Sequence, residues 1–138
     1  MGPTTAKVRV FTPDRRMSSL VELLVDTGST YSWIDADILK ELGIESRAAW
    51  KFKSIDGRMI ERGIGDAYME CLGEVGPSVV VFAEKEDGKV LGLHALEGMR
   101  LEVAPATGGL RKAEAGLALV SRRLQQLLTG PTSSTSSL

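Results

Sequence analysis

The residues best suited to chemistry in this chain form the run Asp26-Thr27-Gly28-Ser29. The aspartate follows the apolar residues 20–25 and precedes the bulky residues 31–34, so we expect its carboxylate to be at least partly desolvated. Such a group must be neutralised, paired or hydrogen-bonded. The threonine and serine place two hydroxyls beside it, and the glycine permits a tight turn and the close approach of another backbone. The run therefore has the parts that hold a carboxylate in one orientation.

Asp-Thr-Gly by itself is also found as an ordinary turn in which the aspartate only caps the backbone. The surroundings favour a chemical role here. One apolar, strand-like segment precedes the run and another β-prone segment follows it. Val90-Leu91-Gly92 comes about sixty residues later, just before residues 93–99, which have the composition of one or two helical turns.

The elements that must position these residues are mostly short strands separated by turns. Alternating or β-branched segments predict strands at residues 7–11, 20–25, 31–34, 50–55, 58–62, 67–72, 78–83 and 101–103. Turns are expected at 12–14, 73–77 and 87–88. Asp35 and Asp37 indicate a helix start, Ile38, Leu39 and Leu42 give that helix an apolar face, and Gly43 is suited to end it.

A hairpin is predicted where Asp56-Gly57 joins the segments 50–55 and 58–62. Aspartate-glycine is typical of a type I′ turn, whose two central residues both need positive φ. Gly63 and Gly65 are expected to interrupt the return strand before the strand at 67–72. Gly63-Ile64-Gly65 is a rival hairpin tip, which we rank second because its hairpin signal is weaker.

Length and composition indicate one ordinary domain without a metal or disulfide framework. The chain has 138 residues, a formal net charge of −1, one cysteine and one histidine. We therefore expect Cys71 to be a small buried hydrophobe and His94 to be structural, and we expect no metal site and no cofactor. Nothing in the charge or hydropathy pattern predicts binding to nucleic acid or membrane, so a cytoplasmic protein is expected.

Near the end of the chain the spacing of apolar residues changes from that of a strand to that of a helix. Leu117, Val120, Leu124 and Leu127 lie on one face of a helix predicted after residue 113. We divide the chain into a domain at 1–112, an amphipathic extension at 113–128 and a tail at 129–138 that is predicted to be disordered. The extension is expected to pack on its own domain or on a dimer partner, or else to dock another protein.

The order of these parts resembles the retropepsin-like aspartic peptidases, in the style of their prokaryotic and cellular branch. That family has an apolar strand, Asp-Thr/Ser-Gly-Ser/Ala, a hairpin flap, and a hydrophobic-hydrophobic-glycine segment that begins a short helix. The matching parts here are residues 23–29, a flap at about 51–62 and residues 90–96. Leu42-Gly43-Ile44 matches the Leu-Gly-Ile with which the first helix of such proteins often ends. The resemblance covers roughly residues 8–110.

The resemblance implies an all-β, closed-barrel-like fold with one or two short helices, active as a homodimer. Asp26 would be the catalytic carboxylate, and the second one would come from a partner chain, because no other aspartate here precedes Thr/Ser-Gly. By resemblance, Thr27 would hydrogen-bond across the dimer interface, the Gly28 backbone would approach the partner loop and substrate, and Ser29 would orient the carboxylate. Residues 110–113 could join a strand layer at that interface.

The resemblance also implies which residues bind substrate. The tip residues Ile55, Asp56, Gly57 and Arg58 would close over an extended peptide, and Leu91 and Gly92 would contribute from the later segment. The tip is more polar than the glycine-rich flaps of viral enzymes. Thr30 and Leu93 stand where viral enzymes often have an aspartate–arginine pair. The function expected is that of a homodimeric aspartic endopeptidase; the alternative is a catalytically silent or narrowly self-processing dimer that serves as a peptide-binding module.

Overall fold

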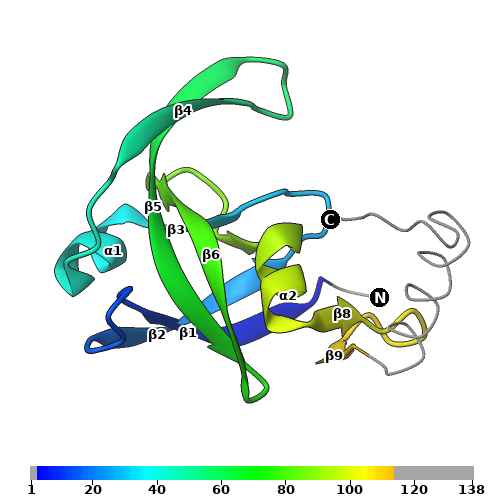
Figure 1. Ribbon diagram of the computed structural model, residues 1–138. Helices are drawn as coiled ribbons and strands as arrows, with labels where there is room; N and C mark the ends of the chain where they lie inside the picture. Colours follow the sequence, from blue (N-terminus) through cyan, green and yellow to red (C-terminus); the bar gives the residue numbers. More distant parts are fainter. Residues whose placement is uncertain (1–2, 114–138) are drawn as a thin grey trace, which may run out of the picture.

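The chain is built mainly of β-strands, with two short helices, as expected from the sequence (Figure 1). This computed structural model describes residues 3–113. The predicted extension at 113–128, apart from Ala113, and the predicted tail at 129–138 lie outside the described residues. In chain order the elements are β1 (Thr5–Phe11), β2 (Ser18–Val25), β3 (Ser32–Asp35), α1 (Ala36–Leu42), β4 (Ala48–Lys53), β5 (Met59–Cys71), β6 (Glu74–Ala83), β7 (Val90–Leu91), α2 (Leu93–Met99), β8 (Leu101–Val103) and β9 (Leu110–Lys112).

A closed ring of strands forms the body of the molecule. The large sheet has the order β1-β2-β7-β3-β6-β5-β4, and a further pairing of β1 with β5 closes the strands from β1 to β5 on themselves. Closure removes the free edges of these strands. β4 pairs only with β5 in this sheet and so lies outside the ring, while β8 and β9 form a separate small sheet.

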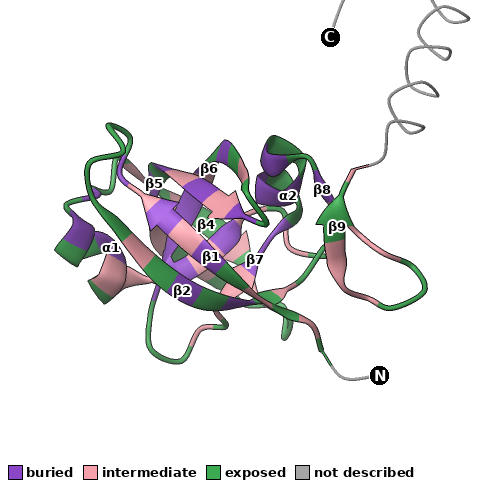
Figure 2. Ribbon diagram, turned by 90° about the horizontal axis from the view of Figure 1, so that it is seen from below, coloured by how far each residue is buried: buried purple, intermediate pink, exposed green. Residues whose placement is uncertain are grey.

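The interior of the ring is filled by every second residue of its strands. On β1 and β2 the buried residues Val8, Val10, Val21 and Leu23 alternate with more exposed ones, and Val8 stands opposite Val21. This two-residue period is what a strand with one buried face requires. Figure 2 shows the buried positions gathered where the strands face one another. The core continues to Leu91 and to the buried side of α2.

The long strand β5 corrects two expectations. Gly63 and Gly65 do not interrupt it, because β5 runs unbroken from Met59 to Cys71. A side chain at Gly65 would lie 2.9 Å from the carbonyl oxygen of Glu45, so this glycine lets a neighbouring segment cross closely over the strand. Gly63-Ile64-Gly65 therefore lies in mid-strand, where Gly63 and Ile64 pair with β4 and Gly65 pairs with β6, and is not a hairpin tip.

The predicted hairpin at Asp56-Gly57 exists, but its turn differs from the prediction. The Gly57 amide donates to Ser54 (2.9 Å) and the Ser54 amide to Arg58 (2.7 Å), while only Gly57 of the central residues has positive φ (87°). This is a three-residue loop with glycine in the left-handed region, not a type I′ turn. The Asp56 carboxylate accepts bonds from Ser54 and from the Arg58 amide, which favours this conformation.

Another turn was predicted too broadly. Residues 73–77 do not form one turn: the chain reverses at Leu72 and Gly73, and Pro77 lies inside β6, opposite Tyr68. The glycine at position 76 has a separate role. A side chain there would lie 2.9 Å from the Met99 amide, so Gly76 allows α2 to pack closely on β6.

Both helices begin and end as the sequence indicates. The Asp35 carboxylate caps α1 by accepting a bond from the Asp37 amide (2.8 Å), and Gly43 ends it in the left-handed conformation (φ 86°).

Cys71 is buried, as expected, and burial raises the pKa of its thiol. Within residues 3–113 no helix has the length and apolar character needed to cross a membrane.

Candidate active site

Asp26 stands directly after β2, at the point where β2 runs parallel to the short strand β7. Val25 pairs with Leu91, and the Asp26 amide donates to the Leu91 carbonyl (3.0 Å). Its carboxylate accepts a bond from the Gly28 amide (2.9 Å), and its carbonyl accepts one from the Ser29 amide (3.1 Å). These bonds close residues 26–29 into a compact loop, called the Asp26 turn below.

Two expectations about the Asp26 turn need correction. Asp26 is exposed in the single chain, not partly desolvated, because the turn leaves the end of the barrel instead of entering its core. The Ser29 hydroxyl donates to the carbonyl of Tyr31 (2.7 Å) and so stabilises the loop backbone; the carboxylate is held by a main-chain amide instead. An exposed carboxylate that is already oriented can meet a ligand or a second chain.

The start of α2 holds the far side of the Asp26 turn. The Leu93 amide donates to the Ser29 carbonyl (2.8 Å), and the His94 amide donates to the Thr30 carbonyl (2.9 Å). Gly92 has no room for a side chain, because a Cβ would lie 2.8 Å from the Ser29 carbonyl oxygen and closer still to Tyr31. The predicted hydrophobic-hydrophobic-glycine segment therefore packs directly against the Asp26 turn.

Ser32 completes this support and was not singled out from the sequence. It is fully buried, and its hydroxyl accepts a bond from the Gly92 amide at 2.9 Å, across sixty positions of sequence. A serine at the start of a β-prone segment gives no local signal of such a role. Its position opposite Gly92 appears only when β3 and β7 are paired.

A cleft of about 580 Å³ opens between the Asp26 turn and the hairpin formed by β4 and the first part of β5. The hairpin rises away from the barrel and arches over this end of the molecule (Figure 1). A third wall comes from the turn between β6 and β7. The lining residues are Asp26, Gly28, Ser29, Trp33, Phe52, Lys53, Ser54, Ile55, Asp56, Ile60, Glu86, Asp87, Gly88 and Val90.

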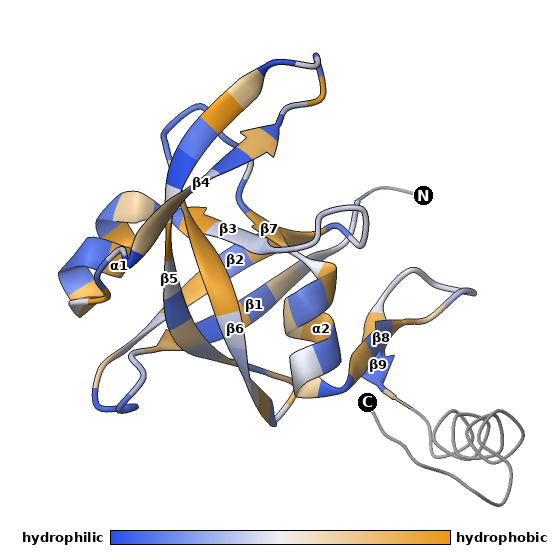
Figure 3. Ribbon diagram, turned by 45° about the horizontal axis from the view of Figure 1, so that its top comes forward, coloured by the Kyte–Doolittle hydropathy of each residue, from blue (hydrophilic) through white to orange (hydrophobic). Residues whose placement is uncertain are grey.

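Aromatic side chains join the hairpin to the residues after the Asp26 turn. The Trp33 and Phe52 rings meet edge to face with their centroids 5.1 Å apart, and the Tyr31 and Trp50 rings are 5.5 Å apart. Alternation along β4 places Trp50 and Phe52 on the same side of the strand. Figure 3 shows the resulting change between apolar and polar positions along the hairpin. The local sequence gives no signal of these ring contacts.

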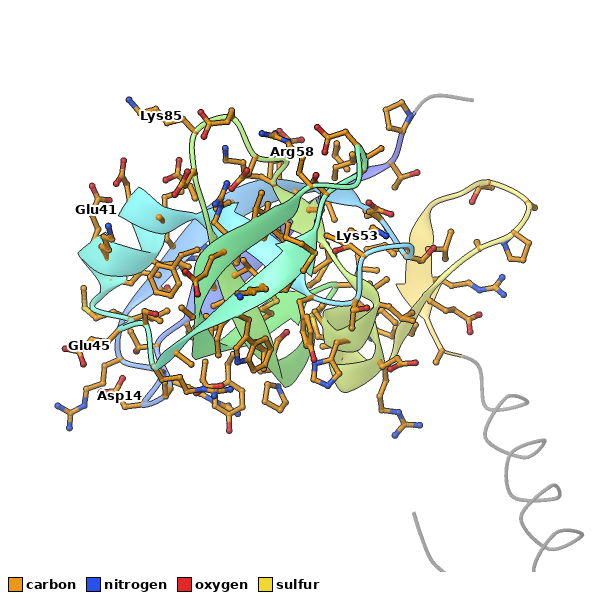
Figure 4. The ribbon with its side chains drawn as sticks, turned by 90° about the horizontal axis from the view of Figure 1, so that it is seen from above. Asp14, Glu41, Glu45, Lys53, Arg58 and Lys85 are labelled. Carbon is orange, nitrogen blue, oxygen red and sulfur yellow. The ribbon has the colours of Figure 1, made fainter. Side chains whose placement is uncertain are left out.

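The hairpin tip combines an exposed apolar residue with a polar loop. Ile55 is fully exposed to solvent. Asp56 accepts bonds from the Ser54 hydroxyl and the Arg58 amide, and these bonds lower the pKa of its carboxyl; an ion pair with Arg58 (3.0 Å) adds to them. Figure 4 shows Lys53 and Arg58 at this end of the hairpin. The tip is thus ordered by its own side chains and leaves Ile55 available to contact a ligand.

The structure gathers half of the ten predicted site residues around the cleft. Asp26, Gly28, Ser29, Ile55 and Asp56 line it, whereas Thr27, Gly57, Arg58, Leu91 and Gly92 are not part of its lining. Leu91 is fully buried and supports the Asp26 turn through its carbonyl group. Over residues 3–113 no three histidine, cysteine or acidic side chains are grouped so that they could hold a metal ion.

Comparison with known proteins finds matches among solved structures. No protein-family model and no curated protein sequence matches the chain. Among solved structures it is similar to the solution structure of the protease of simian foamy virus (mac), with a TM-score of 0.45 and 12% sequence identity. That similarity covers 68% of this chain and 92% of the viral one. A likeness this distant leaves function to be judged from the site itself.

Proposed function

We propose that this chain is one half of an aspartic endopeptidase that works as a homodimer. The observation that supports this most directly is the position of Asp26. Its carboxylate is exposed at the floor of a cleft, is oriented by a main-chain amide, and lies beneath a hairpin suited to cover an extended peptide. A fixed carboxylate that faces a covered cleft is what activation of a water molecule against a peptide bond requires.

The second carboxylate is expected from a second copy of the chain. Two other aspartates line the cleft, but Asp56 is paired with Arg58 and Asp87 with Arg62. Glu86 also lines the cleft, from an exposed position on the β6–β7 turn. A two-fold axis beside the Asp26 turn would bring two identical, exposed Asp26 carboxylates together without disturbing either ion pair.

Two such carboxylates at about 3 Å cannot both ionise readily, so they share one proton and titrate as a pair. The ionised member takes a proton from a water molecule, whose oxygen attacks the carbonyl carbon of the peptide. The protonated member donates its proton to the carbonyl oxygen. Collapse of the tetrahedral intermediate breaks the C–N bond, and the amine nitrogen leaves with a proton returned by the pair. The products are a carboxylic acid and an amine.

The walls of the cleft favour a peptide with apolar side chains next to the bond that is cut. Trp33, Phe52 and Ile60 present apolar surface beside Asp26. The hairpin above it offers backbone groups that can bond to an extended chain, as in strand-addition binding. Closing such a hairpin over the peptide would exclude water from the reacting bond.

Cleavage of an unstructured protein from about pH 3.5 to about pH 7.5 tests the proposal, because the dyad needs one protonated and one ionised carboxylate. Wild type is compared with Asp26→Asn and with Asp37→Asn, a control in the first turn of α1, outside the cleft. We expect cleavage by wild type and the control, inhibition by a pepstatin-like compound, and loss of cleavage in Asp26→Asn while light scattering still reports a dimer.

The alternative function is that of a dimeric peptide-binding module without catalysis. Its support is the aromatic wall made by Trp33 and Phe52, which would bind a peptide whether or not Asp26 reacts. A folded dimer that binds apolar peptides but cleaves none at any pH would favour this alternative. A chain that stays monomeric under all conditions would contradict the proposed enzyme, because half a dyad cannot carry out this reaction.

A further inference from the structure

Arg62 of β5 and Asp87 of the β6–β7 turn form an ion pair at the side of the cleft. Arg62 Nε lies 2.7 Å from Asp87 Oδ2, and Arg62 Nη2 lies 3.0 Å from Asp87 Oδ1. This two-bond arrangement matches the planar guanidinium to the planar carboxylate. The two side chains are only 13% and 11% exposed. The pair is therefore a directional contact that is largely shielded from solvent.

The remaining polar groups of this pair are also bonded. The Glu84 amide donates to Asp87 Oδ2 (2.8 Å), and Arg62 Nη1 donates to the Glu61 carbonyl (2.9 Å). Lys89 Nζ donates to the carbonyls of Glu84, Lys85 and Asp87 and so fixes the same turn from its other end. The β6–β7 turn, residues 84–88, is consequently a rigid support for one end of the ion pair.

The pair connects two different walls of the cleft. Arg62 lies on the hairpin directly opposite Trp50 and two residues after the cleft-lining Ile60. Asp87 lies between Glu86 and Gly88, all three of which line the cleft from the other side. A movement of the hairpin away from the Asp26 turn would have to break this contact or drag the 84–88 turn with it.

Other ion pairs of the hairpin differ in exposure. Arg58 and Asp56 at the tip are 76% and 60% exposed, and Arg47 and Asp66 near the base are 47% and 53% exposed. Exposed pairs contribute little to structure, whereas breaking a buried pair leaves a charge without its partner. The Arg62–Asp87 pair is thus the one of these three that can determine where the hairpin sits.

We propose that Arg62 and Asp87 are positioning residues that hold the hairpin at its working height above Asp26 by joining it to the 84–88 turn. This rests on the proposed peptidase function. Neither residue touches the reacting atoms. Their contact sets the distance between the hairpin wall and the opposite wall, and therefore the fit of an extended peptide. Its loss should weaken substrate binding more than it slows the reaction of bound substrate.

The surroundings of the pair favour the ionised form of both side chains. The hydrogen bond from Arg62 lowers the pKa of Asp87, with further lowering by the Glu84 amide and by the charges of Arg62 and Lys89. The hydrogen bond to Asp87 raises the pKa of Arg62, and the charges of Asp87, of Glu84, whose Oε1 lies 3.5 Å from Arg62 Nη2, and of Glu86 raise it further. The positioning contact therefore persists to lower pH than an aspartate with an ordinary pKa would allow.

The test compares steady-state kinetics of wild type with Asp87→Asn, Arg62→Lys and the control Arg47→Gln. For Asp87→Asn we expect KM to rise about tenfold while kcat stays within about threefold, the pattern of lost substrate positioning. Arg62→Lys keeps the positive charge but cannot make two parallel hydrogen bonds to Asp87. Its KM should therefore lie between those of wild type and Asp87→Asn. Arg47→Gln breaks the exposed Arg47–Asp66 pair near the base of the hairpin. It should leave KM and kcat unchanged.

A second measurement does not depend on activity. Amide hydrogen exchange of residues 48–53 and 59–64 should become faster in Asp87→Asn than in wild type, while the amides of β1 and β2 keep their protection. Urea unfolding shows that each variant is folded. An unchanged KM together with unchanged hairpin exchange would overturn the positioning role. If wild-type dimers show no peptidase activity, the proposed function fails, and hairpin exchange alone decides whether the pair positions the hairpin.

Discussion

The Asp26 turn and the β4–β5 hairpin face each other across the cleft but are held in opposite ways. The Asp26 turn is fixed by main-chain bonds to Leu91, Leu93 and His94, which belong to β7 and α2. The hairpin leaves the barrel, pairs only within itself at its outer end, and is held down by aromatic contacts and the Arg62–Asp87 pair.

This difference assigns different physical roles to the two regions. Main-chain bonds to a buried segment allow little movement, which suits a carboxylate that must keep one orientation. Side-chain contacts around an otherwise exposed hairpin allow more movement than main-chain bonds do, which suits the proposed role of the hairpin as a cover for a peptide. Substitutions beneath the Asp26 turn should therefore change stability most, and substitutions in the hairpin should change substrate binding.

The largest effect is expected at the glycine beneath the Asp26 turn. Gly92→Ala would push a methyl group against the carbonyls of Ser29 and Tyr31, and we expect it to lower the free energy of unfolding by about 3 kcal/mol. Urea unfolding measures this. Gly88→Ala is the matched control, because the nearest atom to its new methyl group would be 3.8 Å away. Equal effects of the two substitutions would contradict the close packing of Gly92.

A somewhat smaller effect is expected at Ser32. Ser32→Ala removes the hydroxyl that accepts the Gly92 amide and leaves that amide buried without a partner, at a cost of about 2 kcal/mol. Ser46→Ala, which removes an exposed hydroxyl bonded to the Ala48 carbonyl, should cost much less. Thermal unfolding of both variants decides the matter, and a Ser32→Ala protein as stable as wild type would show that the bond contributes nothing.

At the hairpin tip a substitution should change substrate binding and leave the stability of the fold almost unchanged. Ile55→Ser should change the free energy of unfolding by less than about 0.5 kcal/mol, because Ile55 is fully exposed. On an apolar peptide substrate it should lower kcat/KM by about tenfold. Met59→Ser alters another exposed hairpin residue that does not line the cleft, and it should leave kcat/KM unchanged. Equal kinetics for both variants would remove Ile55 from the binding surface.

The smallest effect concerns pH. The folded chain lowers the pKa of Asp87, so its contribution to stability is complete above the unfolded-state value of about 3.9 and is lost as the pH falls through the lowered value. The difference in unfolding free energy between wild type and Asp87→Asn should be constant from neutral pH to about pH 5 and shrink only in strong acid. A difference that shrinks near neutral pH would mean that the carboxyl is not paired as described.

Local patterns predicted the elements well but not the contacts between them. Alternation located the strands, and Asp35 and Gly43 located both ends of α1. Glycine is harder to interpret from sequence: the pattern predicts strand breaks at Gly63 and Gly65, whereas in the structure both lie within β5 and leave room for residues 45 and 46 to pass close to the strand. Such close approaches depend on the tertiary arrangement, so the sequence around each glycine gives no signal of them.

The same limit applies to the candidate site. The Asp-Thr-Gly-Ser run and the hydrophobic-hydrophobic-glycine segment were visible as motifs, and their contact is present in the structure. The sequence does not predict the Ser32–Gly92 bond, the Trp33–Phe52 contact or the Arg62–Asp87 pair. Each joins residues that are far apart in the sequence, and neither helix nor strand periodicity relates such residues to one another. The apolar neighbours of Asp26 predict a carboxylate that is at least partly desolvated, but Asp26 is exposed in the single chain, and so is Leu24 of the preceding strand.

The central claim is that one active site needs Asp26 from two chains, and subunit mixing tests it most directly. Wild-type and Asp26→Asn chains are unfolded, combined in equal amounts and refolded together at constant total concentration, and peptide cleavage is measured. If both carboxylates are required, only dimers of two wild-type chains react, and activity should fall to about a quarter of that of wild type alone. Activity of about one half would mean that each chain works by itself and would contradict the shared site.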